Sequence, residues 1–123
     1  MDVMVFNVHS FVDVITNSST ELFVCDTEKS AEAVGELLRE VLAGYNVSMG
    51  TDFQFDAVFC EPEVATAESV RQLGADWGDY YRMPHLKEGA ILIYGAADNS
   101  IPYEMWGMIE SRLGWAVDRV HLG

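Results

Sequence analysis

The segment GAILIYG, residues 89–95, decides the fold of this chain. Its residues 90–94 form an uninterrupted apolar run between two glycines. Such a run is shorter than a typical helix and is typical of a strand in the middle of a sheet. We therefore expect residues 90–94 to form the central strand, and the rest of the chain is interpreted around it.

The clearest helix is predicted before this strand. Over residues 34–42, apolar side chains recur at the spacing of one helical stripe. Asp26 or Thr27 is the expected cap at its start, and Gly44 is the expected end. The stripe consists of Val34, Leu37, Leu38, Val41 and Leu42.

Two further helices are predicted. The stronger one follows the central strand, with Ser100 as its cap and Gly114 at its end. The weaker one begins at Thr66 and is ended by Pro84. The apolar stripe of the stronger helix consists of Ile101, Met105, Met108, Ile109 and Leu113.

Further strands are predicted from apolar, β-branched and aromatic residues. They cover residues 22–25, residues 53–60 and residues 115–122. In residues 115–122 the alternation of apolar and polar side chains changes phase near Asp118, which indicates a bulge or an edge position. Residues 3–15 are expected to add one or two short strands.

This order of elements predicts an α+β fold. We expect a single mixed or antiparallel sheet, two strong helices and one weak helix, with the helices on one face of the sheet. A ferredoxin-like split β-α-β core, with the 66–82 helix as an insertion, fits the order best. A small mixed α/β sheet is the alternative.

The length and hydropathy of the chain restrict its class. A chain of 123 residues is expected to form a single domain over residues 1–123. No apolar run approaches the roughly 18 residues of a transmembrane helix, and the first residues lack the basic start of a secretion signal. We therefore expect a cytoplasmic protein.

Strong negative charge is the main functional signal. The chain has 20 acidic and seven basic residues, so its formal net charge is -13. Such a surface repels nucleic-acid phosphates and anionic membranes, so we expect neither as a direct partner. A protein with a basic surface is the expected partner, although the acids could also serve only solubility.

The negative charge is concentrated in the first part of the sequence. Residues 1–70 carry a net charge of -11, whereas residues 71–123 carry only -2. We therefore predict an acidic patch that binds the partner. Its residues are Glu32, Glu36, Glu40, Asp52, Asp56, Glu61, Glu63 and Glu68.

An aromatic segment over residues 77–83 is a second candidate interface. Tryptophan, tyrosine and arginine are enriched among the residues that contribute most to binding at protein interfaces. The alternative interpretation is that these side chains cover the sheet. The candidate residues are Trp77, Tyr80, Tyr81 and Arg82.

A hydroxyl-rich turn over residues 16–21 offers a different function. Its side chains could bind a small molecule or a nucleotide through a divalent metal, or could simply hydrogen-bond their own backbone. The chain has no phosphate-binding glycine loop and no dinucleotide fingerprint. The candidate ligand-binding residues are Asn17, Ser18, Ser19, Thr20 and Glu21.

Other chemistry is not indicated. His9, His85 and His121 are far apart and lack the spacing of metal ligands, so no metal site and no cofactor are expected. Cys25 and Cys60 are interpreted as reduced thiols at strand ends. No nucleophile motif is present, so no catalytic residue is assigned.

Two stretches carry a resemblance. NSSTELF, residues 17–23, and the segment from Asp98 to Tyr103 together with the terminal RVHLG resemble small uncharacterised proteins encoded by bacteriophages. The resemblance implies no activity and no catalytic residue. It implies a context in which small acidic proteins bind host macromolecules.

These observations favour one function over two others. We expect an acidic, non-enzymatic interaction protein that binds or blocks a basic, nucleic-acid-binding host or defence factor. The alternative is a small-molecule or nucleotide-binding protein or enzyme that uses the 16–21 turn with a divalent metal. A structural or assembly protein is the third hypothesis.

Overall fold

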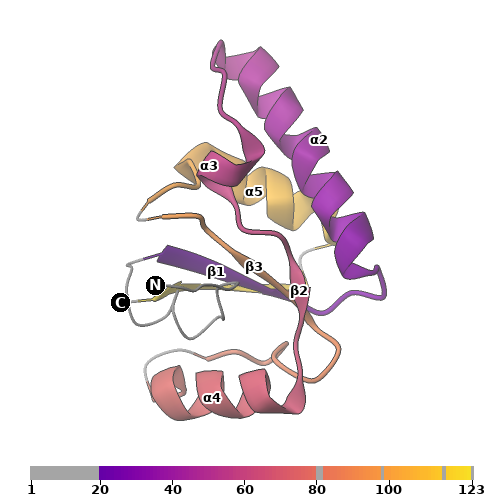
Figure 1. Ribbon diagram of the computed structural model, residues 1–123, viewed down its shortest axis with the longest axis vertical. Coiled ribbons are helices and arrows are strands. Elements are labelled where there is room, and N and C mark those ends of the chain that lie inside the picture. The colour runs from indigo at the N-terminus through magenta and orange to yellow at the C-terminus, as the bar shows by residue number, and fades with distance from the viewer. Residues whose placement is uncertain (1–19, 80–81, 98, 115, 123) are drawn as a thin grey trace, which may run out of the picture.

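The computed structural model describes residues 20–79, 82–97, 99–114 and 116–122. In these residues the strands form a four-stranded antiparallel sheet in the order β2-β3-β1-β4 (Figure 1). The predicted α+β class with a single sheet is therefore confirmed. The strands are β1 (Thr20–Cys25), β2 (Glu63–Val64), β3 (Ile91–Tyr94) and β4 (Val117–Leu122), and the helices are α2 (Ala31–Met49), α3 (Phe55–Val58), α4 (Ala67–Trp77) and α5 (Tyr103–Arg112).

The predicted central strand is confirmed as β3. It pairs with β1 on one side and with β2 on the other, and all of its residues are buried. Because successive side chains of a strand point to opposite faces, β3 contributes to two separate cores. Ile91 and Ile93 join the core under α2 and α5, whereas Leu92 and Tyr94 join the core under α4.

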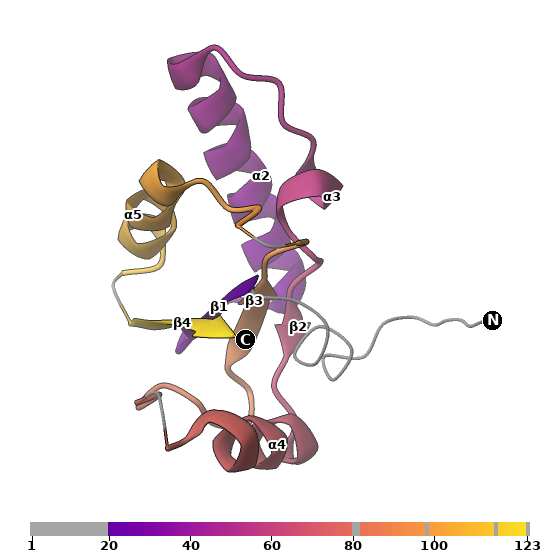
Figure 2. The ribbon, with the colours of Figure 1, turned by 90° about the vertical axis from the view of Figure 1, so that its left-hand side faces the viewer.

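The sheet is covered on both faces, which corrects the expectation of helices on one face. α2, α3 and α5 lie on one side of the sheet and α4 lies on the other (Figures 1 and 2). In β1, Phe23 belongs to the first core and Leu22 to the second. The continuous apolar run of the central strand therefore reflects helices packed on both faces of the sheet.

The connections place strands that are distant in sequence side by side. α2 lies on the path from β1 to β2, and β3 lies between these two strands in the sheet. α5 likewise joins β3 to β4, and β1 lies between them. α4 connects β2 to β3 on the opposite face. This arrangement brings α2 and α5 together, and they pack against each other.

The longest helix begins and ends later than expected. Ser30 caps α2 by accepting a hydrogen bond from the backbone N–H of Ala33, and Gly50 ends it with a left-handed φ of 68°. Asp26 is not the cap, because its carboxylate pairs with Lys87 at 3.0 Å. Gly44 is not the end, because Tyr45 continues the buried stripe.

Residues 53–60 were expected to form a strand, and this prediction was wrong. Phe55–Val58 form the short helix α3, after which Phe59 alone makes a bridge to Gly95. The Phe55 ring packs on the Phe59 ring, with centroids 5.5 Å apart, so the aromatic residues pack on each other instead of alternating across a sheet. The strand that pairs with β3 on the side away from β1 is β2, which was not predicted.

The other boundaries also differ from expectation. α4 is capped by Thr66 as predicted, but it ends at Trp77, before the expected end at Pro84. Ser100 does not cap α5, which starts after Pro102. The Ser100 hydroxyl instead donates to the carbonyl of Val58 at 2.8 Å. β4 lies at the edge of the sheet and pairs with β1 in continuous register. Of the two alternatives predicted for this strand, a bulge or an edge position, the edge position is therefore correct. The strands expected over residues 3–15 lie outside the described residues.

Candidate functional site

Acidic side chains line the outer side of α2. Glu32, Glu36 and Glu40 follow one another at intervals of four residues, so they lie on the same side of the helix. All three are exposed. Asp52 follows the end of α2 and Asp56 lies on α3, and both are exposed as well.

Two arginines connect α2 to its neighbours. Arg39 on α2 pairs with Glu61 at 2.5 Å, and its guanidinium lies 3.9 Å from the centroid of the Phe55 ring. Arg112 on α5 pairs with Glu40 at 2.6 Å. These contacts tie α2 to α3 on one side and to α5 on the other. They also partly neutralise the carboxylates of Glu40 and Glu61, and sequence reasoning did not identify either arginine.

Six of the eight predicted acids lie on α2, on α3 or on the segments next to them, and two do not. Within the described residues, no ion pair is found for Glu32, Glu36, Asp52 or Asp56. Glu68 lies on α4, across the sheet, where it pairs with Arg71. Glu63 is half-buried in β2. We define the α2–α3 acidic surface as Glu32, Glu36, Glu40, Asp52, Asp56 and Glu61.

Glu63 is set apart by its environment. Desolvation by burial raises the pKa of its carboxyl above the ordinary value. Nearby, burial and then the charge of Glu63 raise the pKa of the Tyr94 hydroxyl. A carboxyl that is costly to ionise is a poor contributor to an electrostatic surface, so Glu63 is removed from the candidate site.

Replacing Glu63 by glutamine is expected to stabilise the protein at neutral pH and to change nothing in acid. Because the folded pKa is raised, the contribution of Glu63 to stability is present below its unfolded pKa and is lost as pH rises through the folded pKa. Urea unfolding of both proteins from about pH 4 to about pH 7 measures this. A stability difference that stays constant over this range contradicts the assignment.

The two cysteines have no nucleophilic character. Burial, with a smaller effect from Asp118, raises the pKa of the Cys25 thiol to about 12. Burial and the charge of Glu63 raise the pKa of Cys60. Both are free thiols; Cys25 ends β1 as expected, whereas Cys60 follows α3 and does not end a strand. A nucleophilic cysteine needs a lowered pKa, so neither residue is a candidate for catalysis.

The predicted aromatic segment is only partly described. Trp77 is half-buried and packs against the core under α4, which agrees with the interpretation that it covers the sheet. Arg82 is exposed. Tyr80 and Tyr81 lie outside the described residues, so the predicted aromatic interface is represented here by Arg82 alone.

The hydroxyl-rich turn is also described only at its end. Asn17, Ser18 and Ser19 lie outside the described residues, and Thr20 begins β1. Glu21 is 2 % exposed, and its Oε2 lies 2.8 Å from Nδ1 of His121 on β4. Its Oε1 is buried, and no described residue makes a hydrogen bond to it. Sequence reasoning placed Glu21 in a ligand site, whereas the structure buries Glu21 and pairs it across the sheet with His121, whose side chain is half exposed.

Among the described residues, no group of three or more histidine, cysteine, aspartate or glutamate side chains is placed to hold a metal ion. His85 donates its backbone N–H to Asp118 at 2.7 Å, and its ring lies 3.8 Å from Asp26. His121 pairs with Glu21. His9 lies outside the described part. In that same part, no helix combines the length and the apolar character needed to cross a membrane.

Comparison of the chain with protein-family models, with curated proteins and with solved structures found no match. Function is therefore inferred from the residues of this chain and from their geometry.

Proposed function

We propose that the chain is an acidic, non-enzymatic interaction protein that binds a basic surface of a protein partner through the α2–α3 acidic surface. One observation carries the proposal. Glu32 and Glu36 are exposed on consecutive turns of a long helix, and neither has an ion-pair partner among the described residues. Their charges are thus available to a partner.

The geometry supports binding because the helix that carries the carboxylates is held in place. The buried stripe of α2 is anchored in the core by Val34, Leu38 and Val41. The ties from Arg39 and Arg112 fix the helix on both flanks. A rigid array loses little conformational entropy on association, so more of the electrostatic attraction remains as affinity.

The class of partner follows from the spacing of charge. Carboxylates repeated along a helix offer a row of anions, as the phosphates of nucleic acid do, and this row is complementary to a basic groove. We propose a nucleic-acid-binding host or defence protein as the partner. The resemblance of the chain to small bacteriophage proteins supports this context.

The test compares two charge-matched double variants. Glu32→Gln with Glu36→Gln removes two charges from α2, and Glu68→Gln with Asp76→Asn removes two charges from α4 on the other side of the sheet. Each tagged protein is used to capture partners from a bacterial lysate. A basic nucleic-acid-binding protein retained by the wild type and the α4 variant, but about tenfold weaker on the α2 variant, is the expected result.

Salt dependence provides the second arm of the test. Binding through exposed charges weakens steeply as salt rises, because the Debye length falls to about 8 Å at physiological ionic strength. The affinity for the captured partner is therefore expected to fall across a salt titration. Equal loss in both double variants, or an affinity independent of salt, would falsify the proposed surface.

We also propose that the fold is a ferredoxin-like core with α4 as an insertion. Two features support this. β1 and β2 run in the same direction with β3 between them, and β3 and β4 run in the same direction with β1 between them. The two crossover helices α2 and α5 lie on the same face of the sheet (Figure 2). This is the pattern of two interlocked split β-α-β units.

A further inference from the structure

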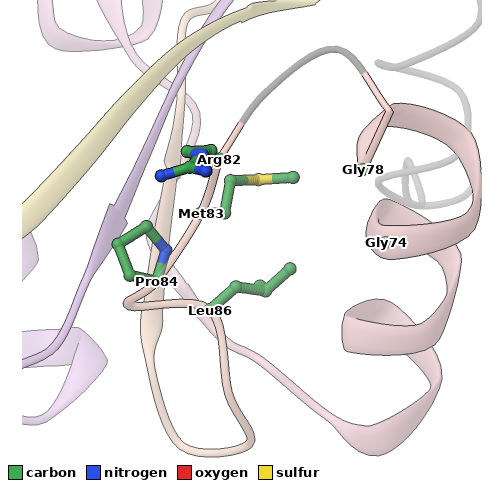
Figure 3. Close-up of a pocket in the computed structure, with 6 residues that line it drawn as sticks. All are labelled: Gly74, Gly78, Arg82, Met83, Pro84 and Leu86. Carbon is green, nitrogen blue, oxygen red and sulfur yellow. The ribbon is translucent and has the colours of Figure 1, made fainter.

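A hollow lies between α4 and the segment of residues 82–86 (Figure 3). α4 lies across the sheet from α2 and α3 (Figure 1). The hollow has a volume of about 470 Å³, which falls within the range of small-molecule pockets. It is lined by Gly74, Gly78, Arg82, Met83, Pro84 and Leu86.

The walls of the hollow are apolar. The side chains of Met83 and Leu86 extend toward α4 in Figure 3. α4 contributes the bare backbone of Gly74 and Gly78. A Cβ built on Gly74 would meet no atom within 4 Å, so the space beside this residue is open. An apolar wall of this kind favours a hydrocarbon group.

One cation lies at this hollow. Arg39, Arg71 and Arg112 each pair with a carboxylate. Arg82 is exposed, and among the described residues no carboxylate pairs with it. In a chain with a net charge of -13, an arginine without such a partner is available to an external anion.

We propose that this hollow binds a small amphipathic carboxylate, with its hydrocarbon part against Met83 and Leu86 and its carboxylate on Arg82. Apolar walls and a single guanidinium together select a hydrocarbon with one negative charge. A dianion such as a phosphate monoester is disfavoured, because the net charge of -13 repels it and Arg82 is the only cation among the described lining residues. The inference is independent of the proposed function.

The test uses decanoate as the probe and two glycine variants. Gly74→Leu fills the hollow, whereas Gly107→Leu places the same side chain on α5, where a Cβ also meets nothing within 4 Å. Both sites are exposed helix positions, so both variants are expected to fold. Calorimetric titration below the concentration at which decanoate aggregates should show binding to the wild type and to Gly107→Leu, and loss of binding in Gly74→Leu.

A second pair of variants tests the charge. Arg82→Gln is expected to weaken decanoate binding about fivefold, because an ion pair in contact with water contributes modestly. Lys29→Gln makes the same change in net charge at an exposed position that does not line the hollow, and it should leave binding unchanged. Decanol should bind the wild type more weakly than decanoate does.

Three outcomes would overturn the proposal. The first is no binding of decanoate to the wild type. The second is equal binding to Gly74→Leu and Gly107→Leu, which would place the probe elsewhere. The third is decanol binding as tightly as decanoate together with no effect of Arg82→Gln, which would remove the anionic group from the ligand class.

Discussion

Leu92→Ala is expected to destabilise the protein as severely as Ile93→Ala, by about 2–5 kcal/mol for each substitution. The two residues are neighbours in β3 and are fully buried, but they point to opposite faces of the sheet. Each change removes buried methyl groups and leaves a cavity, Ile93→Ala under α2 and α5 and Leu92→Ala under α4. Urea unfolding followed by circular dichroism gives both free energies.

Val64→Ala is the control for this comparison. Val64 lies in the neighbouring strand β2 and is 50 % exposed, so its truncation is expected to cost under about 1 kcal/mol. A sheet covered on one face would give a large loss for only one of the two β3 variants. If Leu92→Ala costs no more than Val64→Ala, the packing of α4 on the sheet is wrong.

His121→Ala is expected to lower the free energy of unfolding by about 1–3 kcal/mol. Nδ1 of His121 lies 2.8 Å from Oε2 of Glu21, and the other oxygen of this buried carboxylate has no hydrogen-bond partner in the described part of the chain. Removing the imidazole therefore leaves a buried charged group without this contact, and such a group costs more than a neutral one.

The double variant isolates this pair. Adding Glu21→Gln to His121→Ala removes the buried charge, so the double variant is expected to be more stable than His121→Ala alone. The single variant Glu21→Gln completes the double-mutant cycle. Unfolding curves that coincide for His121→Ala and the double variant would show that the charge of Glu21 is solvated and that the pair contributes nothing.

The elements predicted best are those whose residues repeat with a regular period. The stripe of Val34, Leu37, Leu38, Val41 and Leu42 predicts α2, and all five residues are buried there. The run over residues 90–94 likewise predicts β3. In both, burial follows directly from the order of apolar residues, because the backbone period converts sequence spacing into one face.

Boundaries were predicted less well, because several residues satisfy the same local rule. Asp26, Thr27 and Ser30 all have side chains suited to capping a helix, but Ser30 is the residue that caps α2. The carboxylate of Asp26 pairs with Lys87, and the Asp26 backbone N–H donates to Ala116 at 2.9 Å. These contacts come from segments distant in sequence, so no local pattern indicates them.

The candidate site was likewise predicted only in part from the sequence. Sequence reasoning identified which residues carry the negative charge, but it grouped Glu63 and Glu68 with the acids of α2. Burial sets Glu63 apart, and the position of α4 places Glu68 across the sheet. Arg112 on α5 pairs with Glu40, and Arg39 on α2 pairs with Glu61. These pairs form only because the packing of the elements brings the side chains together.

The sequence by itself determined the class of the fold, the central strand, the main helix and the sign and place of the charge, because these depend on residue type and local period. Only the tertiary structure decided that α4 covers the second face, that Glu21 pairs with His121, and which carboxylates remain unpaired among the described residues. Each of these depends on contacts between distant segments, and such contacts are fixed by how the apolar faces pack together rather than by any neighbouring residue.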